Sequence, residues 1–301
     1  ELEKAIIEVK ERTDAPFGVN LRADAGDAPD RCQLLIDYGV KVASFALAPK
    51  PELIAKLKEH DIVVIPSIGA PKHAKKVAGW GADAVMIQGG EGGGHTGAVP
   101  TTLLLPTVLD AVDIPVIAAG GFFDGRGLAA ALSYGAAGIG MGTRFLLTQE
   151  SRVPDAVKQR YLEADLNGTI VTAKVDGMPH RMLRTPFVEQ VEETSTIKRM
   201  GPTLRRTREF KKMSGMSWPQ LAKDGYQMRK AQGRTLNQMA LAANTPMMLK
   251  AGLVEGDTNA GVLASGQVVG VIDELPTCDE LITRVVTQAA AELRRTQSYL
   301  I

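Results

Sequence analysis

The chain has 301 residues, of which 45% are hydrophobic and 23% are charged, and its formal net charge is +1 at pH 7. These values are ordinary for a globular protein with one large domain, or with one domain and a smaller lobe. The small net charge argues against a nucleic-acid or membrane-surface partner. Cys32 and Cys278, the two cysteines, lie far apart. They argue against a disulfide framework and a cysteine-based zinc site, and they favour a reducing, cytoplasmic location.

No apolar stretch reaches the roughly 20 residues that a membrane helix needs. The chain begins with Glu1 rather than methionine, and residues 1–10 already follow an amphipathic helical pattern. We therefore expect the native protein to contain residues that precede Glu1.

Short apolar runs alternate with longer segments of helical periodicity over the first half of the chain. The predicted strands are 17–21, 42–46, 62–68, 84–88, 115–120 and 138–145. The predicted helices between them are 28–38, 51–59, 71–79, 103–112 and 124–134. Asp124 is placed to cap the last of these helices, while Gly39, Gly79 and Gly135 stand where C-terminal glycines of helices belong.

This alternation predicts a series of βα units. Because the strands are almost entirely apolar, we expect them to be buried on both faces, as in a parallel sheet. A doubly wound sheet and a closed barrel both fit the pattern. Six strands are predicted, and residues before Glu1 would supply the two that complete an eight-stranded barrel. We therefore predict an α/β fold, a (β/α)8 TIM barrel of which this chain carries strands three to eight.

The character of the sequence changes after about residue 150. A helix is predicted near 154–164, a further strand at 169–174 and a last amphipathic helix at 278–296. We expect the barrel to occupy residues 1–175, a mostly helical lobe or lid 176–270, and a C-terminal helix packed on the barrel 271–301. Self-association into a homo-oligomer is compatible with this organisation.

A glycine-rich loop follows the predicted strand 84–88. Six glycines fall within the nine positions 89–97, together with His95. Glycine loses more conformational entropy on ordering than any other residue, so such a loop is typical of a place where backbone approaches a ligand closely. Imidazole titrates near neutral pH, and His95 is therefore a candidate general acid or base. A structural imidazole bonded to loop carbonyls is the alternative.

Two further glycine motifs occur where strands give way to helices. Gly120 and Gly121 follow one predicted strand, and Gly142-Thr143 ends the next one. Backbone amides at such positions bind phosphate, and barrels often hold a phosphate in the loops after strands seven and eight. A tight turn and a crowded barrel corner are the alternatives that need no ligand.

Asn20 and Gln88 place amides at the predicted carboxyl edge of the sheet, where α/β folds bind ligands. An amide suits a heteroaromatic ring edge or a sugar hydroxyl, and equally a structural bond to a loop. We interpret His60, His73 and His180 as structural, and the histidine spacing predicts no metal site. A basic stretch at 198–212 fits a solvated helix face, or else a cradle for the phosphates of a large substrate.

Four motifs, at 16–21, 88–97, 114–127 and 138–145, occur in this order. Jointly they resemble the nitronate monooxygenase family, also called 2-nitropropane dioxygenase-like. The resemblance extends to 176–181 and 265–267 and covers most of the chain, less clearly 190–240.

The resemblance implies a TIM barrel that binds FMN non-covalently. By this resemblance the cofactor-binding residues are Asn20, Gln88, Gly93, Gly94, Gly120, Gly121, Gly140, Met141, Gly142 and Thr143. Asn20, Gln88 and Gly93 would contact the flavin, while Gly121 and residues 140–143 would hold its phosphate. His95 matches the active-site histidine of the family, near the reactive edge of the flavin. The family also places an N-terminal Gly-Met-Gly-type segment against the flavin ring, which residues before Glu1 would supply.

The family covers several substrate classes. Some members oxidise alkyl nitronates with oxygen, some are NAD(P)H-dependent enoyl-thioester reductases, and actinobacterial members act on CoA esters of steroid-ring fragments. Segments 93–97 and 176–181 are most similar to the last group, and Thr96 stands where nitronate-oxidising members often carry Arg.

We therefore expect an FMN-dependent oxidoreductase, with NAD(P)H as a candidate reductant. His95 would move a proton at a carbon next to a nitro, carbonyl or thioester group, and the substrate would be a nitronate or an acyl-CoA-type thioester. A flavin-free barrel that binds a phosphorylated metabolite is the alternative from another class.

Overall fold

The computed structural model describes residues 1–175, 177–193, 245–257 and 261–299. Two compact units divide the chain. Unit 1 consists of Glu1–Gly89, Val99–Ala119 and Ala131–Gly140. Unit 2 consists of Gly90–Ala98, Gly120–Ala130 and the chain from Met141 onward.

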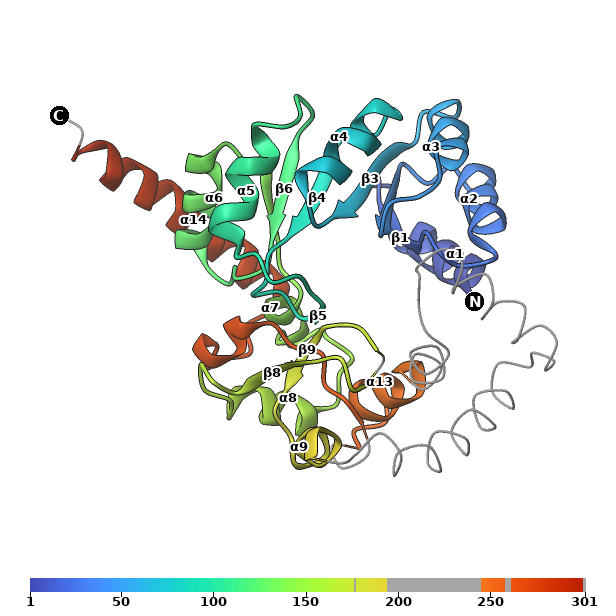
Figure 1. Cartoon of the computed structure of the whole chain (residues 1–301). Helices are drawn as coiled ribbons and strands as arrows, with labels where there is room; N and C mark the ends of the chain where they lie inside the picture. Colours follow the sequence, from blue (N-terminus) through green and yellow to red (C-terminus); the bar gives the residue numbers. More distant parts are fainter. Residues whose placement is uncertain (176, 194–244, 258–260, 300–301) are drawn as a thin grey trace. The chain divides into compact units, whose positions relative to one another are not determined.

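Unit 1 is built on a parallel sheet of six strands in the order β1-β2-β3-β4-β6-β7 (Figure 1). The strands are β1 (Gly18–Arg22), β2 (Val42–Ala46), β3 (Val63–Ile68), β4 (Val85–Gln88), β6 (Val116–Ala119) and β7 (Gly138–Gly140). The helices are α1 (Leu2–Arg12), α2 (Ala28–Asp37), α3 (Pro51–Lys58), α4 (Pro71–Gly79), α5 (Thr101–Leu109) and α6 (Gly125–Tyr134), the last of which begins in unit 2. The predicted succession of βα units, with six strands, is confirmed.

Burial alternates along these strands. In β2, Ala43 and Phe45 are fully buried, whereas Ser44 between them is only partly buried. Successive side chains of a strand point to opposite faces, and in β2, β3, β4 and β6 one face is buried while the other is partly buried or exposed. The expectation of burial on both faces is therefore wrong for the described chain.

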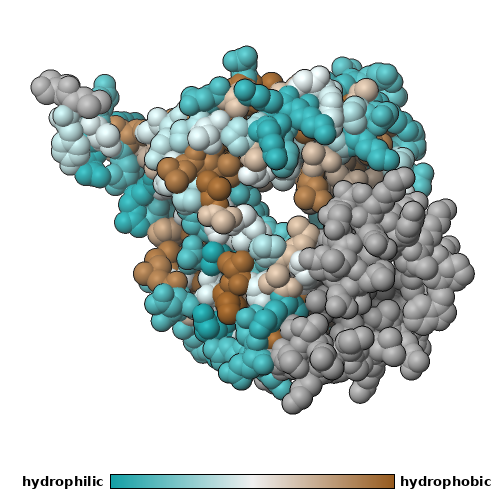
Figure 2. All heavy atoms as spheres, in the orientation of Figure 1, coloured by the Kyte–Doolittle hydropathy of each residue, from teal (hydrophilic) through white to brown (hydrophobic). Residues whose placement is uncertain are grey.

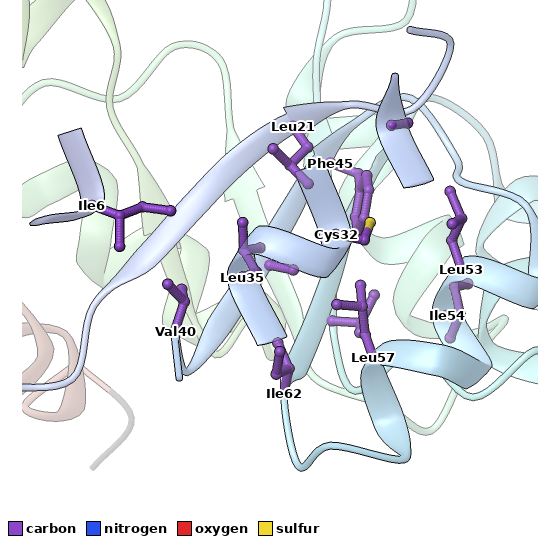
Figure 3. Close-up of a cluster of buried hydrophobic side chains, with 13 residues drawn as sticks. Ile6, Leu21, Cys32, Leu35, Val40, Phe45, Leu53, Ile54, Leu57 and Ile62 are labelled. Atoms are coloured by element: carbon purple, nitrogen blue, oxygen red, sulfur yellow. The ribbon is translucent and has the colours of Figure 1, made fainter. Parts of the chain in front are cut away.

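The buried face joins the core of unit 1 (Figure 3). Leu35 of α2, Phe45 of β2 and Leu57 of α3 are fully buried in it, and Ile6 brings α1 to the same cluster. Leucine and isoleucine at helical spacing in α3 thus meet the alternate residues of the strands. Lysines such as Lys58 and Lys75 lie on the other side of α3 and α4, and Figure 2 shows a mostly hydrophilic surface there.

Unit 2 contains an antiparallel sheet of three strands in the order β5-β9-β8. The strands are β5 (Gly94–His95), β8 (Thr169–Thr172) and β9 (His180–Leu183). Its helices are α7 (Thr143–Leu146), α8 (Asp155–Leu162), α9 (Pro186–Glu193), α13 (Thr245–Leu253), the 3-10 helix η1 (Gln267–Val271) and α14 (Cys278–Gln297). The sequence predicted β8 but neither β5 nor β9.

The core of unit 2 gathers around Leu147, Tyr161 and Leu263, all fully buried. The hydroxyl of Tyr161 donates a hydrogen bond of 2.7 Å to the carbonyl oxygen of Ala264. Burial raises the pKa of this phenol, so the hydroxyl stays protonated as a donor. The segment before η1 is thereby joined to α8.

Three local predictions need correction. The last strand of unit 1 ends at Gly140, because Thr143–Leu146 turns into helix α7 after three glycines that weaken a strand. Asn20 does not end β1, which continues to Arg22. Gly39 (φ +63°) and Gly135 (φ +104°) adopt the left-handed conformation after their helices as predicted, whereas after α4 this role belongs to Gly81 (φ +95°) and not to Gly79.

Residues 194–244 lie outside the described residues, and with them the basic stretch 198–212. At the two margins of this range α9 and α13 are helical. The boundaries predicted at residues 175 and 270 stay predictions. In the described part of the chain, no helix has the length and apolar character needed to cross a bilayer.

Candidate active site

Two candidate residues lie on the sheet of unit 1. Asn20 of β1 is exposed, and its side-chain oxygen accepts a hydrogen bond of 3.0 Å from the hydroxyl of Ser44. The two residues are register partners of β1 and β2. Because the Asn20 oxygen accepts this bond, the NH₂ group of Asn20 is the part directed to other partners. Gln88 is the last residue of β4 and is partly buried.

Gly140 of β7 lies beside two side chains of unit 1. A Cβ added to Gly140 would stand 3.4 Å from the Cβ of Ala119 and 3.5 Å from the Cε of Met86. These are ordinary van der Waals distances, so the neighbouring side chains do not by themselves require glycine at this position.

His95 lies in β5 and faces His180 of β9. The two are register partners, and their ring centroids are 4.9 Å apart with the planes inclined by 50°. His180 is 2% exposed, whereas His95 is exposed. The next amide, of Thr96, donates a bond of 3.1 Å to the carbonyl oxygen of Pro179. His180, interpreted from the sequence as structural, is the first residue of β9, and its ring lies against that of His95.

Arg181, the second residue of β9, anchors the start of the glycine loop. Its guanidinium donates two hydrogen bonds, of 2.9 and 3.2 Å, to the carbonyl oxygen of Gly90 and one of 3.0 Å to the hydroxyl of Thr169. Burial lowers the pKa of Arg181, and the carboxylate of Glu91 acts in the opposite direction. An arginine stays charged under both influences, so β9 places a fixed cation beneath the loop.

The glycine loop also contacts the segment before η1. A Cβ on Gly93 would lie 2.6 Å from the backbone nitrogen of Gly266 and from the carbonyl carbon of Ser265. The amide of Gln267 donates a bond of 2.9 Å to the carbonyl oxygen of Glu91. Glycine at position 93 is thus required by the close approach of two backbones within unit 2.

The two glycines after β6 have left-handed backbones, with φ +96° at Gly120 and +85° at Gly121. The helix that follows them does not offer its first amides to a ligand. The Oδ1 atom of Asp124 accepts hydrogen bonds from the amides of Arg126 and Gly127, and Gln288 of α14 accepts one from the amide of Gly125. The predicted cap by Asp124 is confirmed. The first amides of α6 are therefore already bonded within the protein.

Gly142 and Thr143 begin α7. No heavy atom of the described residues lies within 4 Å of the position that a Cβ on Gly142 would take, beyond its chain neighbours. The hydroxyl oxygen of Thr143 accepts a bond of 2.8 Å from the amide of Gly266, which leaves its own hydrogen for another acceptor. Met141, before Gly142, is partly buried.

Arg144, which follows Thr143, has a structural role. It is 3% exposed, and its guanidinium donates to the carbonyl oxygens of Leu147 and Glu274 at 2.7 and 2.9 Å. Burial lowers its pKa. Arg144 therefore joins α7 to the segment that leads into α14.

The sequence thus identified most of the loop residues and missed their supports. His180 and Arg181 act through contacts with His95 and Gly90, which are distant in sequence, and Thr169 supports Arg181. The motifs at 176–181 and 265–267 were the available signal. Among the described residues, no group of three or more His, Cys, Asp or Glu side chains is arranged to hold a metal ion.

Comparison with known proteins identifies the family. The family model described as nitronate monooxygenase matches residues 28–288. A protein of Rhodococcus jostii named (3aS,4S,5R,7aS)-5-hydroxy-7a-methyl-1-oxo-octahydro-1H-indene-4-carboxyl-CoA dehydrogenase is 66% identical over 96% of this chain and 82% of its own length. A protein of the same name from Mycobacterium tuberculosis is 64% identical over 98% of this chain and 84% of its own length.

The structure of FabK from Thermotoga maritima is similar to this one with a TM-score of 0.78 and 32% identity, over 99% of this chain and 83% of that chain. FabK is a TIM-barrel enzyme, and its similarity agrees with the six parallel strands of unit 1. The chain belongs to the nitronate monooxygenase family, and it is an oxidoreductase with a TIM-barrel fold.

Proposed function

We propose that the protein is an FMN-dependent dehydrogenase of a CoA thioester, in which His95 takes a proton from the carbon next to the thioester carbonyl. One observation carries this proposal. An exposed imidazole is held on a glycine loop in a chain that is 66% identical to a dehydrogenase named for a ring-carboxyl-CoA ester.

The residues available for FMN fall into two groups. Asn20 and Gln88, with their amides, together with Gly93 and Gly94, would serve the flavin ring. Gly120, Gly121, Gly140, Met141, Gly142 and Thr143 would serve the phosphate. The space beside Gly142 fits a group that approaches the backbone there, and the hydroxyl hydrogen of Thr143 is suited to a phosphate oxygen. At Gly93 the neighbouring backbone explains the glycine equally well.

The chemical role of His95 depends on the substrate class. In the relatives' name the carboxyl-CoA group is on ring carbon 4 and a hydroxyl is on ring carbon 5. Dehydrogenation next to a thioester removes a proton from carbon 4 and a hydride from a neighbouring carbon, and a double bond forms between the two. FMN would supply the acceptor for that hydride. His95 takes the proton, and its exposure lets the proton pass on to solvent.

NAD(P)H is the second redox partner to consider, because the family resemblance includes enoyl-thioester reductases. In that direction the same imidazole would deliver the proton to the α-carbon. Nitronate oxidation is less favoured, because Thr96 stands where members with that activity often carry Arg.

A visible spectrum of the purified full-length protein, followed by anaerobic additions, tests the proposal. We expect flavin bands that are bleached by the hydroxy-indane-carboxyl-CoA ester of the relatives' name and not by an alkyl nitronate. Bleaching by NADH or NADPH alone would favour the reductase. A colourless protein that takes up no added FMN would contradict the proposal and favour the flavin-free phosphometabolite barrel.

A further inference from the structure

We infer that His180 is a positioning residue for His95: the ring of His180 is the platform that holds the His95 imidazole in one orientation. This inference rests on the proposed function for its catalytic consequence. The structural part rests on β5, on β9 and on the contact between the two rings.

Strand β5 is very short. The strand consists of Gly94 and His95 alone, and its partner in the ladder is β9, which places Arg181 opposite Gly94 and His180 opposite His95. Directly opposed residues of an antiparallel pair have their side chains on the same face, with Cβ atoms about 4.5–5.5 Å apart. The position of the His95 side chain is therefore set from β9.

The rings of His95 and His180 differ in burial. His180 is 2% exposed and His95 is exposed. A centroid separation of 4.9 Å with a tilt of 50° is within the range in which aromatic rings contact each other. One side of the His95 ring thus rests on a buried ring, while the residue as a whole is exposed.

The segment around β9 holds the glycine loop on both sides of His95. Arg181 donates two hydrogen bonds to the carbonyl oxygen of Gly90, and the amide of Thr96 donates to the carbonyl oxygen of Pro179. The loop on both sides of His95 is therefore tied to the segment that carries His180. The contact with the His180 ring limits the rotation of the His95 side chain. Displacement of a catalytic group by about 1 Å costs up to about 100-fold in rate.

The test compares two substitutions of similar volume in the full-length holoenzyme. His180→Phe keeps a planar ring, and His180→Leu fills the space without one. We expect His180→Leu to lower kcat for the CoA ester by about 10–100-fold with little change in KM, and His180→Phe to retain most of the activity. In a His95→Ala background His180→Leu should cost nothing more, because a residue that acts through another loses its effect with it.

A second measurement is independent of turnover. The chain has four histidines, so the ring resonances of His95 are assignable in protein with ¹³C-labelled histidine by removing one histidine at a time. We expect the His95 ring signals to move in His180→Leu, while those of His60 and His73 stay in place.

Two results would overturn the inference. One is His95 signals and kcat that are unchanged in His180→Leu. The other is a loss of kcat of the same size with and without His95. Full activity of His95→Ala would instead contradict the proposed function. In protein that retains His95, the ring signals of His95 would still report whether His180 orients it.

Discussion

The two sheets of this protein are specified in different ways. Each strand of the parallel sheet in unit 1 pairs with a strand from a neighbouring βα unit, and its buried residues recur with a period visible over a few positions. In unit 2 the two-residue strand β5 depends on β9, whose Arg181 bonds to Gly90 across 91 residues of sequence. Local periodicity thus determines the scaffold, whereas contacts between distant segments determine where His95 lies.

The sharpest test of this difference separates turnover from stability. His95→Ala should lower turnover of the CoA ester by about 10²–10⁴-fold, because a positioned proton-transfer group is lost. Flavin content and the unfolding midpoint should stay the same, since His95 is exposed. His60→Ala is the matched control, because His60 is also exposed and its imidazole Nδ1 lies 2.9 Å from the carbonyl oxygen of Lys56. Equal turnover in both variants would remove His95 from the mechanism.

The reverse behaviour is expected in the core of unit 1. Leu57→Ala removes a fully buried side chain of α3 and should lower the free energy of unfolding by about 2–5 kcal/mol. Leu103→Ala, in α5, should have little effect because Leu103 is 60% exposed. Urea unfolding of both variants measures the difference. Similar midpoints would mean that the cluster in Figure 3 does not support the scaffold.

Glycine in this loop can be required by close backbone packing or by a ligand, and two substitutions separate these requirements. Gly93→Ala should destabilise unit 2 by about 1–3 kcal/mol, because the added Cβ would lie 2.6 Å from the backbone of Ser265 and Gly266. Gly97→Ala is the control, since in the described structure a Cβ there would meet no heavy atom within 4 Å. Thermal unfolding and flavin retention report the outcome. If Gly97→Ala were the more damaging change, the loop would be adapted to a ligand rather than to its own backbone.

The smallest effect is expected at the start of α14. Thr277 and Glu280 form a capping box, in which the Thr277 hydroxyl accepts from the Glu280 amide and the Glu280 carboxylate accepts from the Thr277 amide. Thr277→Ala should cost about 1 kcal/mol in the free energy of unfolding.

The same box has a pH dependence. The hydrogen bond from the Thr277 amide lowers the pKa of Glu280 below its ordinary value. A lowered folded-state pKa means that the stabilisation is complete above the unfolded value, near 4.3, and is lost as the pH falls through the folded value. Glu280→Gln should therefore weaken the acid dependence of the unfolding midpoint below about pH 5. An unchanged dependence would show that the box does not contribute.

Elements specified by local periodicity were predictable from the sequence, whereas contacts between distant segments were not. Strand 42–46 and helix 71–79 were predicted to the residue, because apolar periodicity and a proline at the first helical position mark them locally. The end of β7 was overestimated, since Gly138, Gly140 and Gly142 look alike in sequence while α7 begins at Thr143.

Sequence reasoning found His95, because the glycines around it are unusual, and passed over His180. Nothing near His180 indicates that its partner lies 85 positions earlier, at His95. Antiparallel pairing between distant short strands has no local period to detect. The close contact of Gly93 with Ser265 and Gly266 was missed for the same reason, because it joins segments that share no sequence pattern.

The bond between Gly125 and Gln288 has a consequence for synthesis of the protein. The amide of Gly125 donates to the Gln288 side chain across 163 residues, and a Cβ on Gly125 would lie 2.5 Å from the carbonyl oxygen of Val285. The start of α6 thus rests directly on the backbone of α14. Domains begin to fold while the ribosome is still extending the chain. The contact between the start of α6 and α14 can therefore form only after α14 has left the exit tunnel of the ribosome.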